Sequence, residues 1–230
     1  MTLRGRPLLE IAAFDVASAL VATWAGADRV ELCAGAGEGG TTPSLGALET
    51  VLEQAAVPVF AMVRARGGSF VYDADEHAAM RRDARHLVRT GAQGLVFGAL
   101  CEEGAVDEDA VRAIVEIAEG RPVTFHRAFD AACEPWEALE ALVRCGVARV
   151  LTSGGPASAL QGFARLGALV KAAVDRLVVM PGGGVRADHV AALVEGTGVR
   201  EVHSAARRSG SYTVDADEVR RLRAALDALA

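Results

Sequence analysis

The chain has 230 residues, of which 51% are hydrophobic, and its formal net charge is −6. This length and apolar content are enough for one sizeable buried core. The acidic balance, 24 Lys and Arg against 30 Asp and Glu, argues against general nucleic-acid binding, which needs clustered basic side chains.

Membrane insertion and secretion are not expected either. No apolar run comes near the roughly 20 residues that a bilayer-spanning helix needs. The first residues lack the long apolar region of a signal peptide. The four cysteines are dispersed, with no C-x-x-C pair, which favours free thiols. We therefore expect a cytoplasmic protein.

Short apolar runs alternate with longer amphipathic stretches along the whole chain. The first pair is a strand at 8–14 and a helix at 15–26, which Asp15 is placed to cap and Gly26 to end. A strand at 29–33, a glycine-rich loop at 34–42 and a helix at 43–54 follow. Further strands are expected at 58–63, 94–100, within 122–130, and at 149–152, 176–180 and 200–203. Their helices are expected at 75–90, 107–119, 134–145, 158–174, 187–195 and 214–229.

About eight strand–helix units with short connections indicate a parallel sheet covered by helices. Eight units in a chain of this length favour closure into a (β/α)₈ TIM barrel. The open doubly wound alternative usually carries a G-x-G-x-x-G turn after its first strand, and that turn is missing here. The sequence predicts an α/β protein with a single TIM-barrel domain over residues 1–230.

Ionisable residues gather where the predicted strands end, which is where TIM barrels place their active sites. The candidate catalytic residues are Glu10, Glu31, Arg64, His126 and Asp130. Paired carboxylates can divide acid and base roles, and a nearby Arg64 would keep at least one ionised. His126 is the best general acid or base, because an unperturbed histidine titrates near neutral pH. The alternatives are a salt-bridged layer that fills the barrel interior and a histidine with a structural role.

Glycines after the later strands give a second signal. Loops after strands seven and eight of a TIM barrel commonly bind phosphate, and glycine lets backbone N–H groups approach an anion closely. Tight turns without any ligand also use glycine. The candidate anion-binding residues are Arg66, Ser153, Gly154, Gly182, Gly183, Gly184 and Ser204.

A metal site is the third possibility. Cys33, Cys101 and Cys133 fall at or just beyond strand ends, and thiolates suit Cu(I) or Zn²⁺. Period-two geometry puts Cys33 on the same strand face as Glu31. Spacing alone favours buried or incidental cysteines, because no short ligand spacing occurs.

Several long motifs resemble the CutC copper-homeostasis family, in the same order and over about residues 8–208. They include Ala27-Asp-Arg-Val-Glu-Leu-Cys-Ala34, Met62-Val-Arg-Ala-Arg-Gly-Gly68 and Thr124-Phe-His-Arg-Ala-Phe-Asp130. The resemblance implies a TIM barrel, a cytoplasmic location, a homo-oligomer and copper handling, with Cu(I) ligation by cysteines such as Cys33. Members of the family often carry a cysteine two residues after the first-strand glutamate, where this chain has Ala12.

Two functions follow from these observations. The first is a copper-binding homeostasis protein with Cys33 as a ligand. The second is an enzyme of lyase, isomerase or hydrolase type that uses Glu and His acid–base chemistry on a small anionic or phosphorylated metabolite. The polar strand ends are more numerous than a two-thiol copper carrier requires.

Overall fold

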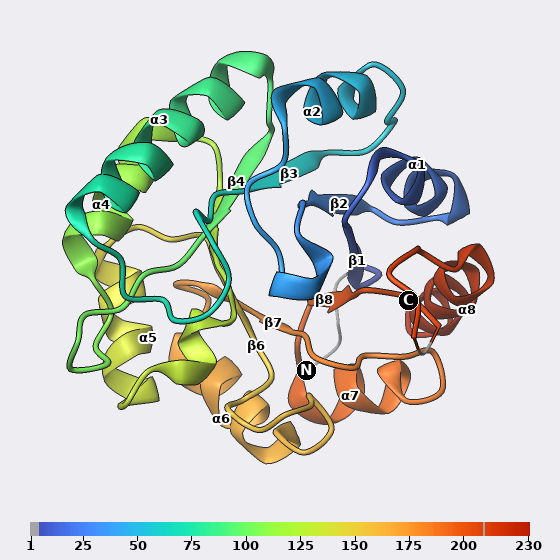
Figure 1. Cartoon of the computed structure of the whole chain (residues 1–230). Coiled ribbons are helices and arrows are strands. Elements are labelled where there is room, and N and C mark those ends of the chain that lie inside the picture. The colour runs from blue at the N-terminus through green and yellow to red at the C-terminus, as the bar shows by residue number, and fades with distance from the viewer. Residues whose placement is uncertain (1–4, 209) are drawn as a thin grey trace.

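Eight parallel strands form the barrel of this computed structural model, which describes residues 5–208 and 210–230 (Figure 1). The helices surround the sheet, one after each strand of the described chain, as the alternating sequence pattern predicts. The TIM-barrel prediction is therefore confirmed. The strands are β1 Leu8–Ala13, β2 Arg29–Leu32, β3 Val59–Met62, β4 Gly94–Phe97, β5 Val123–Phe125, β6 Arg149–Thr152, β7 Val178–Pro181 and β8 Glu201–Ser204.

The outer layer contains eight α-helices in the described part of the chain. They are α1 Val16–Ala25, α2 Leu45–Leu52, α3 Ala74–Thr90, α4 Glu108–Ile117, α5 Pro135–Arg144, α6 Phe163–Ala173, α7 Val190–Thr197 and α8 Ala216–Asp227. Two 3₁₀ turns, η1 Ala36–Glu38 and η2 Arg127–Ala131, lie in the loops after β2 and β5. None of the helices described is long and apolar enough to cross a membrane.

Hydrogen bonds join the strands in the order β7-β6-β5-β4-β3-β2-β1-β8. The strand ladder of the described residues does not continue from β7 to β8, so these two strands meet at a seam. A side-chain hydrogen bond bridges the seam: the hydroxyl Oγ of Ser204, the last residue of β8, donates to the carbonyl oxygen of Val185 in the loop after β7 over 2.7 Å. The barrel is thus complete in shape but not in its backbone ladder.

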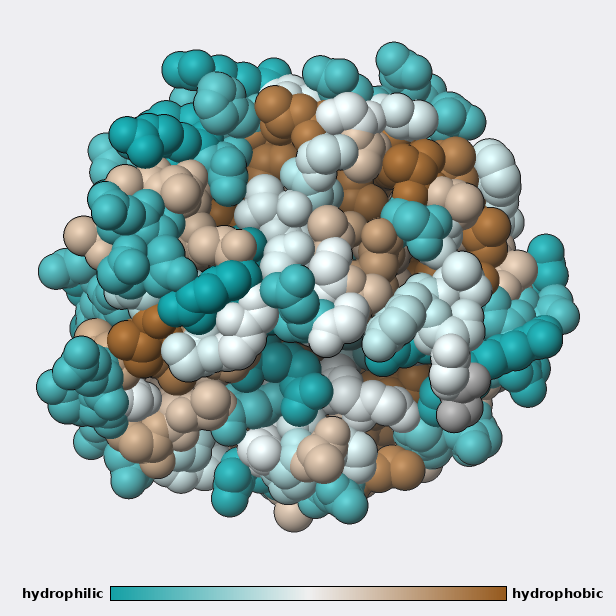
Figure 2. Space-filling model, viewed as in Figure 1, coloured by the Kyte–Doolittle hydropathy of each residue, from teal (hydrophilic) through white to brown (hydrophobic). Residues whose placement is uncertain are grey.

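Apolar side chains fill two separate places. The larger cluster lies between the sheet and the helices and includes Leu9, Ile11 and Leu32, each with no exposed surface. A small cluster inside the barrel contains Cys33, Phe60, Met62 and Val96. On the face seen in Figure 2, hydrophilic side chains cover much of the rim, and others lie within a hollow near the middle.

Local capping explains where several helices begin and end. The Asp15 carboxylate accepts a hydrogen bond from the Ser18 backbone N–H, and Gly26 adopts a positive φ after α1, as the sequence predicts. Helix α6 begins at Phe163 and not at 158. Residues 153–162 form a loop instead. In this loop Gly162 lies so close to Ser153 that a Cβ at position 162 would be 1.7 Å from the Ser153 carbonyl oxygen.

Candidate functional site

A cavity of about 350 Å³ opens at the carboxyl ends of the strands. Both hydrophobic and ionisable side chains line it, and they come from most of the strands. The lining residues are Ala12, Phe14, Glu31, Cys33, Ala36, Gly39, Met62, Arg64, Phe70, His126, Arg127, Leu151, Ala157, Gly183, Gly184, His203, Ala205 and Arg207. Of the residues proposed from the sequence, Glu31, Cys33, Arg64, His126, Gly183 and Gly184 therefore meet in one cavity.

Glu10 lies beneath this cavity with no exposed surface. Its carboxylate accepts hydrogen bonds from Arg29 Nε and, over 2.8 Å, from His203 Nδ1. Burial alone would raise the pKa of Glu10, but the charge of Arg29 and the hydrogen bond and charge of His203 outweigh it and lower the pKa to about 2. Glu10 is therefore ionised at neutral pH. The partner that holds it is Arg29, and not Arg64 as the sequence suggested.

Arg29 is part of a second layer of ion pairs below Glu10. Its Nη2 donates to Glu201 Oε2 over 2.6 Å, and Arg149 Nε donates to the same oxygen over 3.1 Å. Both guanidinium groups stack on the Phe60 ring, 4.8 and 5.1 Å from its centroid. We call Glu10, Arg29, Arg149 and Glu201 the floor cluster.

Glu31 lines the cavity beside His203, whose Nε2 lies 3.7 Å from Glu31 Oε2. The other carboxyl oxygen, Oε1, is buried and has no hydrogen-bond partner among the described residues. Burial, reinforced by the charge of Glu10, raises the pKa of Glu31 to about 7 despite the opposing charge of His203. Glu31 can therefore both take and give a proton near neutral pH.

His203 links the two carboxylates. Since Glu10 is ionised, His203 Nδ1 carries a proton toward it, and Nε2 is left to face Glu31. Burial alone would lower the pKa of His203, but its hydrogen bond to Glu10 and the charges of Glu31 and Glu10 raise it. The result is a Glu10–His203–Glu31 chain along which a proton can be held or moved.

His126 has a different environment. Its Nδ1 accepts a hydrogen bond of 3.1 Å from the Ala128 backbone N–H within η2, so the ring proton of neutral His126 must sit on Nε2. Burial and the charge of Arg64 lower its pKa to about 3. The sequence predicts a general acid or base here. The geometry instead fits a neutral hydrogen-bond donor in the cavity lining, whose N–H at Nε2 has no partner among the described residues.

Arg64 is buried in the same wall and is fixed by backbone carbonyls. It donates to the carbonyl oxygens of Glu38, Gly40 and Gly68, and its guanidinium stacks on the Phe70 ring at 4.7 Å. The same ring lies 5.1 Å from the His126 ring. Because carbonyls do not cancel its charge, Arg64 keeps a positive charge close to His126.

Asp130 does not line the cavity, and we reassign it from catalysis to positioning. Its carboxylate accepts hydrogen bonds from Arg127 Nε, the Ser153 and Gly155 backbone N–H groups, and the Thr152 and Ser153 hydroxyls. Ser153 Oγ in turn accepts from Arg127 Nη2 over 3.0 Å. Gly154 lies in the same turn, and its N–H donates to Thr152 Oγ1. This network ties the β6 loop to Arg127, which does reach the cavity.

Three further anion candidates also lie outside the cavity. Arg66 forms an ion pair with Glu76 and donates to the carbonyls of residues 67, 69 and 71, so its donors are occupied. The Gly182 N–H donates to the Thr152 carbonyl oxygen over 2.9 Å. Ser204 faces a neighbouring hollow, where its hydroxyl donates to the Val185 carbonyl and accepts from the Ala206 N–H.

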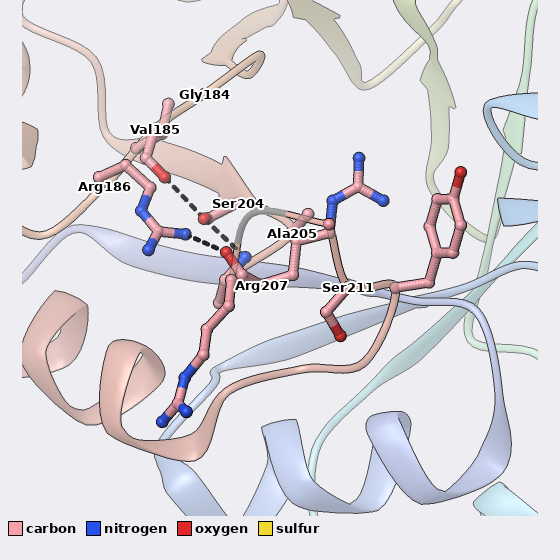
Figure 3. Close-up of a pocket in the computed structure, with 11 residues that line it drawn as sticks. Gly184, Val185, Arg186, Ser204, Ala205, Arg207 and Ser211 are labelled. Atoms are coloured by element: carbon pink, nitrogen blue, oxygen red, sulfur yellow. Dashed lines mark hydrogen bonds between the residues drawn. The ribbon is translucent and has the colours of Figure 1, made fainter. Parts of the chain in front are cut away.

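That neighbouring hollow has a volume of about 440 Å³ and lies between the loops after β7 and β8 (Figure 3). It shares Gly184, Ala205 and Arg207 with the first cavity. Its polar groups are largely paired with one another, because Arg186 Nη1 donates to the Arg207 carbonyl and Arg186 Nε pairs with Glu218. Arg207 borders both hollows, whereas Glu31, Arg64 and His126, which also keep unpaired atoms among the described residues, line the first cavity alone, and we place the candidate site there.

The residues present do not fit a Cu(I) site built from two thiols. Cys33 is the one thiol in the cavity lining, and Ala12 stands on the neighbouring strand where a second would lie. Cys101 lies in the loop after β4 and Cys133 lies just after η2. Both form backbone hydrogen bonds with Gly104, and neither lines the cavity. Burial, with the charges of Glu31 and Glu10, raises the pKa of the Cys33 thiol well above its usual value.

A hard metal ion is no better placed. One ligand atom each from Glu10, Glu31 and His203 lies within 4.8 Å of the others. However, Arg29 and His203 already engage the Glu10 carboxylate, and a guanidinium next to a cation is unfavourable. We assign no metal to these residues.

Sequence reasoning missed three important side chains: Arg29, His203 and Arg207. Arg29 begins β2 two residues before Glu31, so period-two alternation already placed both on the barrel interior. His203 ends the last predicted strand, a position that also suits a loop cap, and the structure places it in β8 and in the cavity lining. Arg207 closes the segment His203-Ser-Ala-Ala-Arg207 after the last predicted strand, but whether it reaches the cavity depends on the conformation of that loop.

Comparison with known proteins identifies close relatives. The CutC family model matches residues 7–208. A CutC family protein of Xanthomonas campestris is 50% identical over 199 residues, which are 86% of this chain and 83% of that protein. The human copper homeostasis protein cutC homolog is 46% identical over 200 residues, 87% of this chain and 73% of that protein. The crystal structure of CutC from Streptococcus agalactiae superimposes with a TM-score of 0.82 at 31% identity, covering 86% of this chain and 98% of that one.

Proposed function

The chain belongs to the CutC family, and from that premise we propose that it is an acid–base enzyme acting on a small anionic metabolite at the barrel mouth. One observation carries the proposal. Glu31 lines the cavity of about 350 Å³ with its Oε2 beside His203, and its other carboxyl oxygen, Oε1, is buried without a partner among the described residues. A buried unpaired polar atom costs roughly 1–3 kcal/mol, a cost that a bound substrate would remove.

The roles follow from the contacts. Glu31 takes a proton from the substrate and returns it at another atom. His203, held through Nδ1 by ionised Glu10, stabilises the charge of Glu31 and can pass the proton on. Arg64 and Arg207 attract the anionic substrate, and the apolar rings of Phe14 and Phe70 exclude water from one side. Proton transfer by a positioned carboxyl group is worth about 10²–10⁴-fold in rate.

The test is hydrogen–deuterium exchange at carbon. Small carbonyl compounds and phosphorylated metabolites would be incubated with the protein in D₂O, and loss of C–H signals followed by NMR. We expect at least one compound to exchange with the natural protein and the rate to fall about 10²–10⁴-fold in Glu31→Gln. Asp109→Asn, a substitution on the exposed face of α4, is the matched control. If no compound reacts, or if Glu31→Gln reacts as fast, the proposal fails.

Copper binding is the second candidate, since the human relative is named a copper homeostasis protein. The specific observation in its favour is that a thiol, Cys33, and a thioether, Met62, line the same cavity. Soft sulfur ligands are those that Cu(I) prefers. The absence of a second thiol from the cavity lining among the described residues makes this the weaker candidate.

An anaerobic competition titration with a chromophoric Cu(I) chelator separates the two functions. On the acid–base proposal, copper uptake should not exceed that of an unrelated protein with free thiols. Tight stoichiometric binding that disappears in Cys33→Ala and persists in Cys145→Ala would establish copper as a ligand of the cavity.

A further inference from the structure

Unpaired polar atoms are concentrated in the wall of the candidate cavity. Six buried side-chain nitrogen or oxygen atoms lack a hydrogen-bond partner in the described part of the chain, and four of them belong to lining residues: Glu31 Oε1, Arg64 Nε, His126 Nε2 and Arg207 Nη1. Arg64 Nε is set aside, since the Tyr72 hydroxyl, also unpaired, lies beside Arg64. The remaining three are two donors and one carboxyl oxygen, and together they describe what a ligand must offer.

The His126 donor is neutral and fixed in direction. Its Nδ1 already accepts from the Ala128 N–H, so Nε2 can only donate. A neutral imidazole N–H suits an oxygen that gains negative charge during a reaction, because it stabilises that oxygen without first carrying a full charge. The natural partner of such a donor is a carbonyl oxygen.

The Arg207 donor carries a full positive charge. Its guanidinium stacks on the Tyr212 ring, 5.0 Å from the centroid, and Nη1 is buried without a partner. No ion pair within the described residues includes Arg207 or Arg64, so two positive charges border the cavity uncompensated. A planar guanidinium of this kind is well suited to a carboxylate.

We propose that the cavity binds a small 2-oxo acid, with its carboxylate on Arg207, its carbonyl oxygen on His126 Nε2–H and the neighbouring C–H facing Glu31 Oε1. This substrate class rests on the acid–base function proposed above and makes it specific. The cavity of about 350 Å³ suits a short-chain acid, and Phe14, Phe70 and Leu151 provide apolar contacts for its carbon chain. A cationic donor from Arg207 and a neutral donor from His126 together favour a carboxylate with an adjacent carbonyl.

The chemistry of the step is enolisation. The Glu31 carboxylate removes the proton from the carbon next to the carbonyl, and the electron pair of that C–H bond becomes a carbon–carbon double bond. The carbonyl π pair moves onto oxygen, where His126 Nε2–H and the positive charge of Arg64 stabilise the enolate. Glu31 then returns a proton to carbon, so no oxidant, reductant or second substrate is needed.

An iminium route is excluded by composition. Such a route needs a lysine amine that condenses with the carbonyl group. The sequence contains one lysine, Lys171, and it lies on α6, outside the cavity lining. The carbonyl must therefore be activated by hydrogen bonding and charge, which His126 Nε2–H and the guanidinium of Arg64 supply.

The experiment measures calorimetric binding of pyruvate, of oxalate and of inorganic phosphate to the full chain. Oxalate is a planar dianion that resembles the enolate of pyruvate, so it should bind at least tenfold more tightly than pyruvate. Arg207→Gln and His126→Asn should each weaken oxalate binding roughly tenfold or more, the loss expected for a hydrogen bond to a charged group. Arg66→Gln, whose donors are occupied outside the cavity, is the control and should bind as the natural protein does.

A second measurement separates this proposal from the function on which it rests. The methyl protons of pyruvate should exchange in D₂O with the natural protein and not with Glu31→Gln, while Glu31→Gln should bind oxalate at least as tightly because a negative charge is removed. Tighter binding of phosphate than of oxalate, or exchange of other compounds without any oxalate binding, would overturn the substrate class alone. Oxalate binding that depends on Arg207, without any exchange activity, would overturn acid–base catalysis and leave the carboxylate site standing.

Discussion

Two sets of buried polar groups lie within one barrel and differ in a single respect. In the floor cluster every charged group has partners: Glu10 binds Arg29 and His203, and Glu201 accepts from two arginines. In the wall of the cavity Glu31, His126 and Arg207 each keep an unpaired atom. Pairing offsets the cost of removing a charge from water, whereas a buried polar group left unpaired is a cost that folding alone does not recover. The difference indicates that the floor serves the fold and the wall serves a ligand.

Removing a charge from the floor cluster should have the largest effect on the free energy of unfolding. Glu10→Gln leaves Arg29 buried without its main partner, which should lower the free energy of unfolding by about 3–5 kcal/mol. Urea denaturation at pH 7 measures this. The double variant Glu10→Gln with Arg29→Gln should lose less than the sum of the two single variants, because neither charge is then left alone. Additive losses would mean that the floor charges do not depend on each other.

Removing the charge of Glu31 from the cavity wall should change the free energy of unfolding in the opposite direction. Because folding raises the pKa of Glu31 from 4.5 to about 7, the folded state binds more protons than the unfolded state between these values, and stability falls as the pH rises through them. Glu31→Gln removes this loss. Its free energy of unfolding relative to the natural protein should rise by up to about 3 kcal/mol between pH 4 and pH 8. Urea denaturation at several pH values would contradict this if the difference between the two proteins stayed constant.

Asp130, like the residues of the floor cluster, should contribute to stability, since its carboxylate accepts several hydrogen bonds. Asp130→Asn removes the charge and turns one acceptor into a donor facing the Ser153 and Gly155 N–H groups. We expect a loss of about 1–3 kcal/mol in the free energy of unfolding. Asp109→Asn, an exposed site, is the control. Unchanged stability with abolished proton exchange would return Asp130 to the catalytic residues.

Arg66 should give the smallest effect. Its ion pair with Glu76 is partly exposed, with 41% of the Arg66 side-chain surface accessible, and exposed pairs contribute little to stability. Arg66→Ala should therefore leave the midpoint of urea denaturation nearly unchanged and oxalate binding unchanged. A strong loss of ligand binding would show that Arg66 itself contacts the ligand.

The barrel could be predicted from sequence because each strand and helix carries its own periodic signal. The same-face relation of Glu31 and Cys33 was also correct, since strand alternation is local. The partners of individual charges could not be predicted. Strand alternation puts Arg29 on the same face as Glu31, but nothing near it in the sequence indicates that β8 brings Glu201 within 2.6 Å of it. The proton position on His126 depends on one backbone N–H in the η2 turn, and the engagement of Asp130 depends on the β6 loop.

The seam between β7 and β8 has a consequence for the motions of the barrel. Backbone amides that face the seam lack a ladder partner in the described residues, so local opening should start there. His203 and Gly184 border this seam, and both line the cavity. A ligand that bridges the loops after β7 and β8 would hold these two strands together where the backbone hydrogen bonds of the described sheet are missing. Amide hydrogens of these two strands would then report whether the cavity is filled, even for a ligand whose chemistry is unknown.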